Sequence, residues 1–250
     1  MMILLKRPSK PSKLTDEYKT SKTLEFKETK KNVWNVPFIK EALLEFSEQK
    51  CAYCECNLIA RGTYMEVEHF HDKTLYPEEV LLWDNLLPSC KTCNTKKSTL
   101  DTKKFPIIDP TCINPKNHFK IRNYYLRGKD YLGQFTIDRL NLNDFERLLC
   151  KRAQVGTIVQ EKIENLNDQI TEITEDNLYK KKGTRLINAI TDLLSKGLPS
   201  QVYSATIASI IINDLSFKEL KQKAIEKKLW NNEHDTIMNK ILEIALDIDS

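Results

Sequence analysis

Four cysteines arranged as two short pairs constrain this chain more than any other feature. Cys51 and Cys54 form the first pair, and Cys90 and Cys93 form the second. Zinc prefers four soft ligands in a tetrahedron, and two cysteines separated by two residues supply half of such a set. The spacing therefore predicts one structural zinc ion held by both pairs, the alternative being four buried thiols without a metal. The insert between the pairs is longer than a simple ribbon loop needs, so it should hold a structure of its own.

The remaining cysteines and the hydropathy bound the class of protein. The chain has seven cysteines, an odd number, and no export signal, which argues against a disulfide framework. No apolar run approaches the roughly 20 residues of a membrane helix. We therefore expect a cytoplasmic protein with no membrane segment. Cys56, Cys112 and Cys150 lie outside the two pairs, and we assign them no role because isolated cysteines are most often small buried apolar residues.

The positive charge of the chain is concentrated in two segments. The net charge is +4, yet residues 1–31 hold nine basic side chains against four acidic ones. Residues 91–104, around the second cysteine pair, hold five basic side chains against one acidic side chain. Such segments are suited to phosphate groups of nucleic acid, although charge alone favours the alternative of an ordinary solvated face.

The pattern around the cysteines predicts a strand, a second strand and a helix. Residues 64–69 alternate, which puts Met65 and Val67 inward and Glu66 and Glu68 outward on a half-buried strand. A short strand around residues 86–87 would run into the second pair, and a helix would follow from Asn94 to Leu100.

The flanking segments differ from this centre. Residues 1–34 have no apolar period and predict a basic extended arm, and Pro37 suits the first turn of a helix. Beyond residue 144, apolar residues recur at helical spacing, with helices expected over 177–196 and 234–248. The predicted fold class is α+β, a small zinc-stapled ββα core with a mainly α-helical C-terminal region. The predicted domains are an arm over 1–34, a nuclease domain over 35–130 and a helical region for assembly or regulation over 131–250.

The insert and its exit carry a motif with a chemical meaning. The order is Cys51-x-x-Cys54, Val67-Glu68-His69, Asn85-Leu86-Leu87-Pro88, and Cys90-x-x-Cys93-Asn94-x-x-Lys97. This order and spacing resemble the HNH endonuclease family, whose centre is called the ββα-metal fold. In that family an acid and a histidine end the first strand, an asparagine lies in the connection, and a histidine or asparagine opens the helix.

The resemblance implies a role for each of these residues. His69 would be the general base that takes a proton from water, a task suited to a group with an ordinary pKa near neutrality. Glu68 and Asn94 would bind one Mg²⁺ or Mn²⁺ through oxygen. Asn85 would hold the loop that aims His69. The plainer alternatives are a structural His69 and asparagines that only cap a turn or a helix, and His71 is either a second metal ligand or, as we favour, a loop residue.

Two departures from the commoner family pattern affect the metal more than the base. This chain has Glu68 where aspartate is frequent, and Asp72 where many relatives have proline. Asn94 replaces the usual final histidine, which leaves harder ligands and favours Mg²⁺ or Mn²⁺ over a tightly held transition metal.

A wider resemblance covers roughly residues 5 to 165. The segments Leu5-Lys6-Arg7-Pro8, Ile107-Ile108-Asp109-Pro110 and Ile137-x-x-Leu140-x-Leu142-Asn143 are similar to the PtuB family of HNH subunits from Septu-type and retron-associated anti-phage systems. That resemblance implies an effector nuclease restrained by an ABC-type ATPase partner, PtuA. DNA is the favoured substrate and transfer RNA the alternative. A different class of function also fits, a non-catalytic zinc-dependent subunit that binds nucleic acid or protein.

Overall fold

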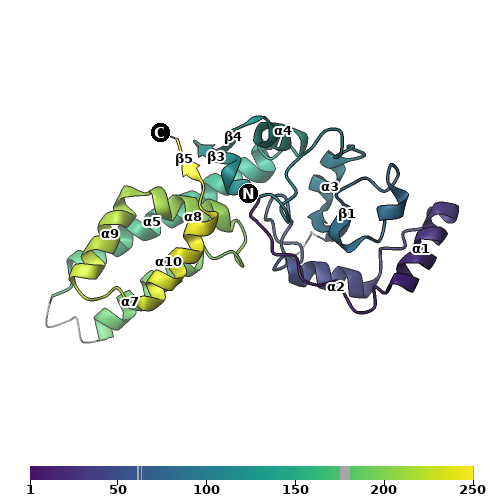
Figure 1. Ribbon diagram of the computed structural model, residues 1–250. Helices are drawn as coiled ribbons and strands as arrows, with labels where there is room; N and C mark the ends of the chain where they lie inside the picture. Colours follow the sequence, from purple (N-terminus) through teal and green to yellow (C-terminus); the bar gives the residue numbers. More distant parts are fainter. Residues whose placement is uncertain (61, 63, 175–180, 250) are drawn as a thin grey trace. The chain divides into compact units, whose positions relative to one another are not determined.

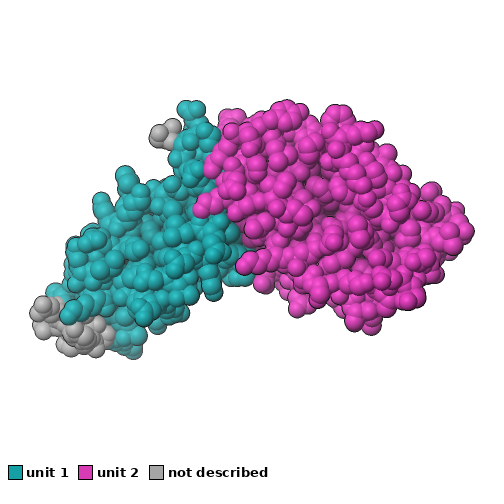
Figure 2. All heavy atoms as spheres, in the orientation of Figure 1, with its two compact units in different colours: residues 1, 119–126, 144–250 teal, residues 2–118, 127–143 magenta. Residues whose placement is uncertain are grey.

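The structure, a computed structural model, describes residues 1–60, 62, 64–174 and 181–249. Its contacts divide the chain into two compact units, which Figure 2 colours separately. Residues 2–118 and 127–143 form the unit that contains both cysteine pairs, called the cysteine unit below. Residue 1, residues 119–126 and residues 144–250 form the helical unit. The predicted functional domains 1–34, 35–130 and 131–250 remain a prediction.

The centre of the cysteine unit is a hairpin followed at once by a helix. Strand β1 (Met65–His69) pairs antiparallel with β2 (Leu86–Cys90), and helix α3 (Lys91–Lys97) continues directly from β2. Helix α3 contacts both strands, and Figure 1 shows it beside β1. The predicted order of strand, strand and helix is therefore confirmed, within a chain whose second unit is mainly helical.

One face of this hairpin builds the hydrophobic core of the cysteine unit. Helices α1 (Asp16–Thr29) and α2 (Pro37–Phe46) contribute to that core, and α2 contacts both strands. The buried cluster joins apolar side chains from both helices, both strands and the connection: Leu14, Phe26, Val33, Trp34, Ile39, Leu43, Val67, Val80, Leu81, Trp83 and Leu86.

The other face of β1 is covered as well, which corrects one expectation. Successive strand residues face opposite sides, so Val67 enters the core while Glu68 points the other way. Glu68 is nevertheless only 2% exposed, because α3 covers that face. The alternation correctly separated the two faces and wrongly predicted that Glu68 meets solvent.

The amino-terminal segment is not an extended arm throughout. Helix α1 begins after Thr15, whose hydroxyl accepts a hydrogen bond from the Tyr18 amide, and ends at Lys30 in the left-handed region with φ of 58°. Phe26 is the buried residue of this helix, so no apolar stripe marked it in the sequence. Ahead of it, Arg7 donates through Nη1 to the carbonyl oxygens of Trp83 and Leu86. The arm thus packs onto the cysteine unit, and Arg7 serves structure there.

Four short elements complete the cysteine unit. Helix α4 (Tyr131–Arg139) starts at Asp130, which caps it by accepting from the Gly133 amide. Single 3₁₀ turns occupy Pro77–Glu79, Trp83–Asn85 and Pro115–Asn117. The first two lie in the connection between β1 and β2, where they fold the insert back on itself.

The helical unit consists of packed helices and a small sheet. A π-helical turn (Phe145–Leu149) leads into the long helix α5 (Cys150–Thr171). Helix α5 contacts α7 (Lys181–Ser195), α8 (Ser204–Asn213) and α9 (Leu215–Glu226). The last helix, α10 (Asn232–Ile244), contacts α7 and α8. The sheet has the order β4-β3-β5, with β3 (Phe119–Arg122), β4 (Tyr125–Gly128) and β5 (Asp247–Ile248), and the division between the units falls within β4, after residue 126.

Two predicted helices differ from the structure in this unit. The helix predicted over 177–196 is observed as α7 from Lys181, and its first predicted residues, 177–180, lie outside the described part of the chain. The helix predicted to close the chain ends at Ile244, because β5 pairs in parallel with β3. Over the described ranges, no helix combines the length and apolarity needed to cross a membrane.

Candidate functional site

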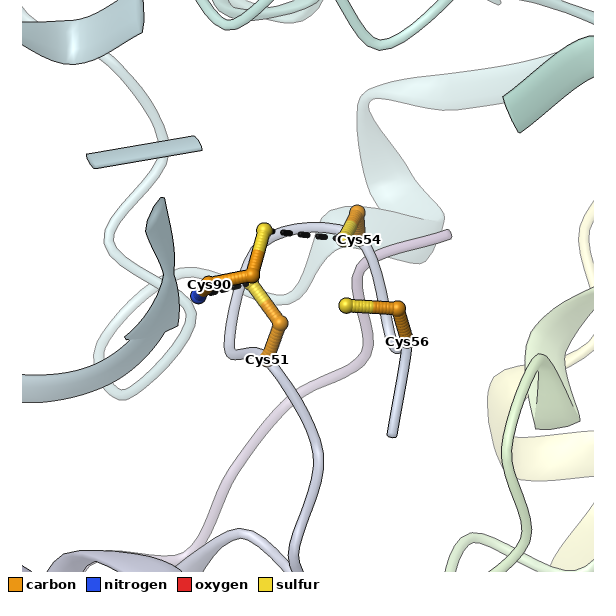
Figure 3. Close-up of side chains that lie close together, drawn as sticks. All are labelled: Cys51, Cys54, Cys56 and Cys90. Atoms are coloured by element: carbon orange, nitrogen blue, oxygen red, sulfur yellow. Dashed lines mark hydrogen bonds between the residues drawn. The ribbon is translucent and has the colours of Figure 1, made fainter. Parts of the chain in front are cut away.

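The structure gathers cysteine thiols into one cluster. Among the described residues, Cys51, Cys54, Cys56 and Cys90 have sulfur atoms that all lie within 4.8 Å of one another (Figure 3). The sulfurs of Cys54 and Cys90 are 3.9 Å apart. Zinc–sulfur bonds of about 2.3 Å in a tetrahedron place sulfurs about 3.8 Å apart, so this donor set fits a single metal ion.

The backbone positions these thiols by joining the two ends of the insert. The Ala52 amide donates to the carbonyl oxygen of Pro88 at 2.9 Å, and the Cys90 amide donates to the Cys51 sulfur at 3.4 Å. Cys93, buried in the first turn of α3, lies outside that set of four, although its thiol interacts electrostatically with Cys51, Cys54 and Cys90. The cluster therefore contains three of the four cysteines predicted as ligands, Cys51, Cys54 and Cys90, and Cys56 is its fourth member. Cys93 as a ligand stays a prediction.

Cys56 is a residue that the sequence analysis missed. It is partly buried, whereas Cys51, Cys54, Cys90 and Cys93 are buried. The available signal was the spacing Cys51-x-x-Cys54-x-Cys56, in which the third cysteine follows the first pair too closely to lie far from it. Cys112 and Cys150 are exposed and stay outside the cluster.

The His69 side chain is held in one tautomer by a backbone carbonyl. Its Nε2 lies 3.0 Å from the oxygen of Val80, and because a carbonyl oxygen only accepts, Nε2 carries the ring proton. Nδ1 is then the basic nitrogen. The Trp34 ring packs edge-on against the imidazole, with 4.6 Å between centroids. Burial, helped by the charge of Lys73, lowers the pKa of His69 to about 3, so the free imidazole is neutral near physiological pH.

Glu68 faces a buried lysine that the sequence analysis quoted without assigning a role. Lys97 Nζ lies 2.7 Å from Glu68 Oε1, and the hydroxyl of Tyr53 is 3.5 Å from the same oxygen. Burial raises the pKa of Glu68 to about 7, although the positive charges of Lys97 and Lys73 oppose that rise. Burial and the ion pair act in opposite directions, and both protonation states are accessible at neutral pH.

The side-chain amide of Asn85 makes hydrogen bonds to the loop that follows β1. Its Oδ1 accepts from the His71 amide at 2.6 Å, and its Nδ2 donates to the carbonyl oxygens of His71 and Glu79 at 3.0 and 3.2 Å. The Phe70 amide also donates to the backbone oxygen of Asn85. These bonds fasten both ends of the loop 71–79, whose next residue is Val80, the partner of His69.

Asn94 lies on α3 beside the strand that carries Glu68. Its Nδ2 donates to Glu66 Oε2 at 2.6 Å, a bond that leaves the amide oxygen unused. Glu66 is a second residue to which the sequence analysis gave no role. The signal that could have found it is its position two residues before Glu68, on the same face of β1.

A shared hollow joins the predicted catalytic residues. Its volume is about 250 Å³, and its lining consists of Glu68, His69, Asp72, Lys73, Asn94, Thr95, Lys97, Ser98 and Thr99. Glu68, His69 and Asn94 are thus brought together, whereas Asn85 is not part of this lining and bonds the loop 71–79. His71 is not part of this lining, and its Nδ1 lies 2.7 Å from the Thr102 hydroxyl. The hollow combines a neutral imidazole, carboxylates and lysines, a set suited to binding and hydrolysing a phosphate ester.

Comparisons with known proteins bear on the family of the chain. The family model described as HNH endonuclease matches residues 51–100, the segment from the first cysteine pair to the end of α3 and just beyond. A curated protein, Septu protein PtuB of Bacillus thuringiensis, is 46% identical over 239 residues, which cover 95% of this chain and 93% of that protein. No solved structure gives a significant match to the chain.

Proposed function

The chain belongs to the Septu PtuB family of HNH endonucleases, and on that premise we propose that it is the metal-dependent effector nuclease of an anti-phage defence system. Its reaction is hydrolysis of phosphodiester bonds, as for HNH endonucleases in general. The observation that supports the proposal is the hollow lined by Glu68, His69 and Asn94, in which the contact of His69 Nε2 with the oxygen of Val80 leaves Nδ1 as the basic nitrogen.

His69 is the proposed general base. With Nε2–H bound to the oxygen of Val80, Nδ1 is the atom that would take a proton from water. The low pKa of His69 keeps the imidazole neutral until substrate arrives. A negatively charged phosphodiester in the hollow would raise that pKa, since nearby negative charge favours the protonated ring. The proton transfer is then coupled to the presence of substrate.

Asn85 is the proposed positioning residue for that base. Its three hydrogen bonds fasten the loop 71–79, and the loop leads to Val80, whose carbonyl fixes the ring of His69. A correct ring orientation matters because proton transfer requires hydrogen-bond distance to the attacking water.

Glu68 and Asn94 are the proposed ligands of Mg²⁺ or Mn²⁺. The contacts of Glu68 with Lys97 and Tyr53 fall on Oε1, and the bond from Asn94 to Glu66 uses the amide nitrogen. The second carboxylate oxygen and the amide oxygen are the hard donors that such a cation prefers. When bound, the cation supplies Lewis-acid stabilisation of charge on the phosphate and on the leaving 3′ oxygen.

Zinc is the proposed occupant of the thiol cluster. A donor set made only of cysteine sulfur favours zinc over the hard cations, and a closed four-sulfur site stabilises a fold without taking part in hydrolysis. The cluster brackets β1, β2 and the start of α3, so the metal would fix the geometry of the neighbouring hollow.

DNA is the favoured substrate, with transfer RNA as the alternative. The lining of the hollow offers lysine ammonium and hydroxyl groups, which recognise phosphate and carry little sequence information. The choice of DNA rests on the resemblance to HNH endonucleases, most of which cut DNA. The proposed partner is a PtuA-like ABC-type ATPase that restrains the nuclease, and the proposed location is the cytoplasm, where the free thiols of this chain would stay reduced.

The test compares the wild type with His69→Ala and with His118→Ala as a matched control. His118 belongs to the same unit, and its side chain pairs with Asp130, away from the hollow. Each protein is incubated with plasmid DNA and with total transfer RNA in Mg²⁺ or Mn²⁺, with and without a co-expressed ATPase. We expect His69→Ala to lose about 10²- to 10⁴-fold in cleavage rate, as removal of a general base does, and His118→Ala to keep its rate.

Each outcome of that experiment distinguishes the proposed nuclease from one of its alternatives. Equal cleavage by wild type and His69→Ala eliminates the assigned base. If the wild type cleaves transfer RNA and not plasmid DNA, the proposed substrate is wrong, and the proposed reaction, hydrolysis of phosphodiester bonds, stands. If His69→Ala also protects cells from phage as well as the wild type does, the non-catalytic binding role replaces the nuclease role.

A further inference from the structure

With Cys93 of α3 added to the four thiols of the cluster, five cysteines are candidates for the four ligand places of a tetrahedral metal ion. Figure 3 shows the Cys56 side chain directed toward Cys51, Cys54 and Cys90, the set whose sulfurs lie within 4.8 Å of one another. Cys93, in the first turn of α3, interacts electrostatically with the same three thiols. Structural zinc takes four protein ligands, so three thiols are common to two possible sets and the fourth place has two candidates.

Cys56 owes its position to a turn that does not depend on a metal. The Cys51 amide donates to the oxygen of Cys56, and the Glu55 amide donates to the oxygen of Cys51, both at 2.9 Å. Glu55 adopts a φ of 60°, which folds the chain back after the first pair. A bridge between Lys50 and Asn57 closes the turn.

A buried ion pair reinforces this turn from inside. Lys50 Nζ lies 3.1 Å from Glu55 Oε1, and each side chain is 2% exposed. Removing one partner of a buried pair leaves an uncompensated charge, so loss of either side chain would disturb the turn. Cys56 is therefore held in the cluster by the backbone bonds of the turn and by the Lys50–Glu55 pair.

We propose that Cys56 is an alternative fourth ligand of the structural metal, exchanging with Cys93 while Cys51, Cys54 and Cys90 stay bound. In the exchange one metal–thiolate bond forms as another breaks, and the proton that leaves the Cys56 thiol is balanced by one taken up by the Cys93 thiolate. No electron is transferred. The partial exposure of Cys56 gives that proton a path to solvent, whereas Cys93 is buried.

The two possible ligand sets, one with Cys93 and one with Cys56, tie different segments of the chain to the metal. With Cys93 as the fourth ligand, the metal ties down the first turn of α3, and the next residue is Asn94. With Cys56 in that place, the metal holds only the turn after the first pair and the end of β2. Exchange would thus loosen the helix that carries Asn94 and Lys97 without releasing the metal. The inference rests on the proposed metal site and is independent of the substrate.

The experiment uses the full chain and four variants, Cys56→Ser, Cys93→Ser, the double variant and Cys112→Ser as a control with an exposed cysteine outside the cluster. Zinc content is measured by native mass spectrometry, and the number of thiolates by the charge-transfer absorption of the cobalt-substituted proteins. We expect one metal ion and four thiolates in each single variant. In the double variant the metal should pass to a chelator at least about tenfold faster than from either single variant, because only three thiolates remain.

The Cys56→Ser variant allows a second measurement, the rate of zinc release, in a chain that keeps Cys93. Without its alternative ligand, the zinc should pass to the chelator several-fold faster than in the wild type or in Cys112→Ser. An unchanged release rate overturns the inference. So does a Cys93→Ser chain that unfolds or lacks metal while the wild type holds it, because Cys56 then cannot replace Cys93. A wild type without metal would instead refute the proposed metal site itself.

Discussion

Lys97 and Glu68 form an ion pair enclosed by the protein, with 2.7 Å between Nζ and Oε1 and exposures of 1% and 2%. The same ammonium group donates to the backbone oxygen of His69 at 2.7 Å. Helix α3 and strand β1 are therefore joined by a charge at the point where the proposed base and the proposed metal ligand follow one another. Stability and the arrangement of the site depend on the same contact.

The first prediction concerns this pair. Lys97→Met should lower the free energy of unfolding by about 3–5 kcal/mol at alkaline pH, because it leaves the carboxylate of Glu68 buried and uncompensated. The loss should shrink in mild acid, where Glu68, with its raised pKa, takes up a proton. Urea unfolding at both pH values measures this. Lys96→Met, at an exposed neighbour on the same helix, should change little, and equal effects of the two substitutions would contradict the prediction.

The second prediction concerns the loop held by Asn85. Asn85→Ala removes three side-chain hydrogen bonds and leaves buried backbone groups unpaired, at a cost of about 1–3 kcal/mol. Amide hydrogen exchange in residues 71–79 should accelerate, and cleavage should slow although His69 is intact. Mass spectrometry of the exchanged peptides checks this, with Asn117→Ala, at an exposed asparagine, as the control. Unchanged protection of the loop would show that Asn85 does not hold it.

The third prediction follows from the pKa of His69, lowered by burial from 6.5 to about 3. Below pH 6.5 the unfolded chain binds a proton that the folded chain refuses, so this residue costs stability as pH falls from 6.5 toward 3. Each pH unit in that window removes about 1.4 kcal/mol. The stability of the wild type relative to His69→Gln should therefore fall by about 2 kcal/mol between about pH 7 and about pH 5. A constant difference would mean that His69 titrates normally.

The fourth prediction concerns the metal itself. Cys90 belongs to both possible ligand sets, so Cys90→Ser should lower zinc stoichiometry and melting temperature together, because structural zinc contributes directly to folding. Treatment of the wild type with a strong chelator should produce the same loss. Elemental analysis and calorimetry on the same samples test the link, with Cys112→Ser as the control. A melting temperature that survives complete zinc removal would refute it.

The parts of the fold that the sequence predicted are those that local spacing dictates. The two cysteine pairs and the alternation before His69 indicated a hairpin followed by α3, since ligand spacing and strand period are properties of neighbouring residues. Helix α1 was missed because it buries one aromatic residue, Phe26, and so has no periodic apolar face. Strand β5 was missed because its only described partner, β3, lies more than a hundred residues earlier in the chain.

In the candidate site, too, local sequence order predicted some features, and the packing of distant segments determines the others. Glu68, His69 and Asn94 were found from their order in the chain, and the structure brings them to one hollow. The burial of Glu68, its pairing with Lys97 and the bond from Asn94 to Glu66 depend on how α3 lies against β1. No local pattern reports such packing. Cys56 was dismissed by a rule for isolated cysteines, and it is isolated only along the sequence.

The chain crosses between its two units several times, since residues 119–126 belong to the helical unit and residues 127–143 return to the cysteine unit. A stop codon after residue 143 would therefore remove β5 and leave β3, already synthesised, with its parallel edge uncovered. A protease cutting once between the units would not release either as a complete piece. An end-to-end fusion that replaces everything after one point in the sequence would accordingly exchange neither unit as a whole.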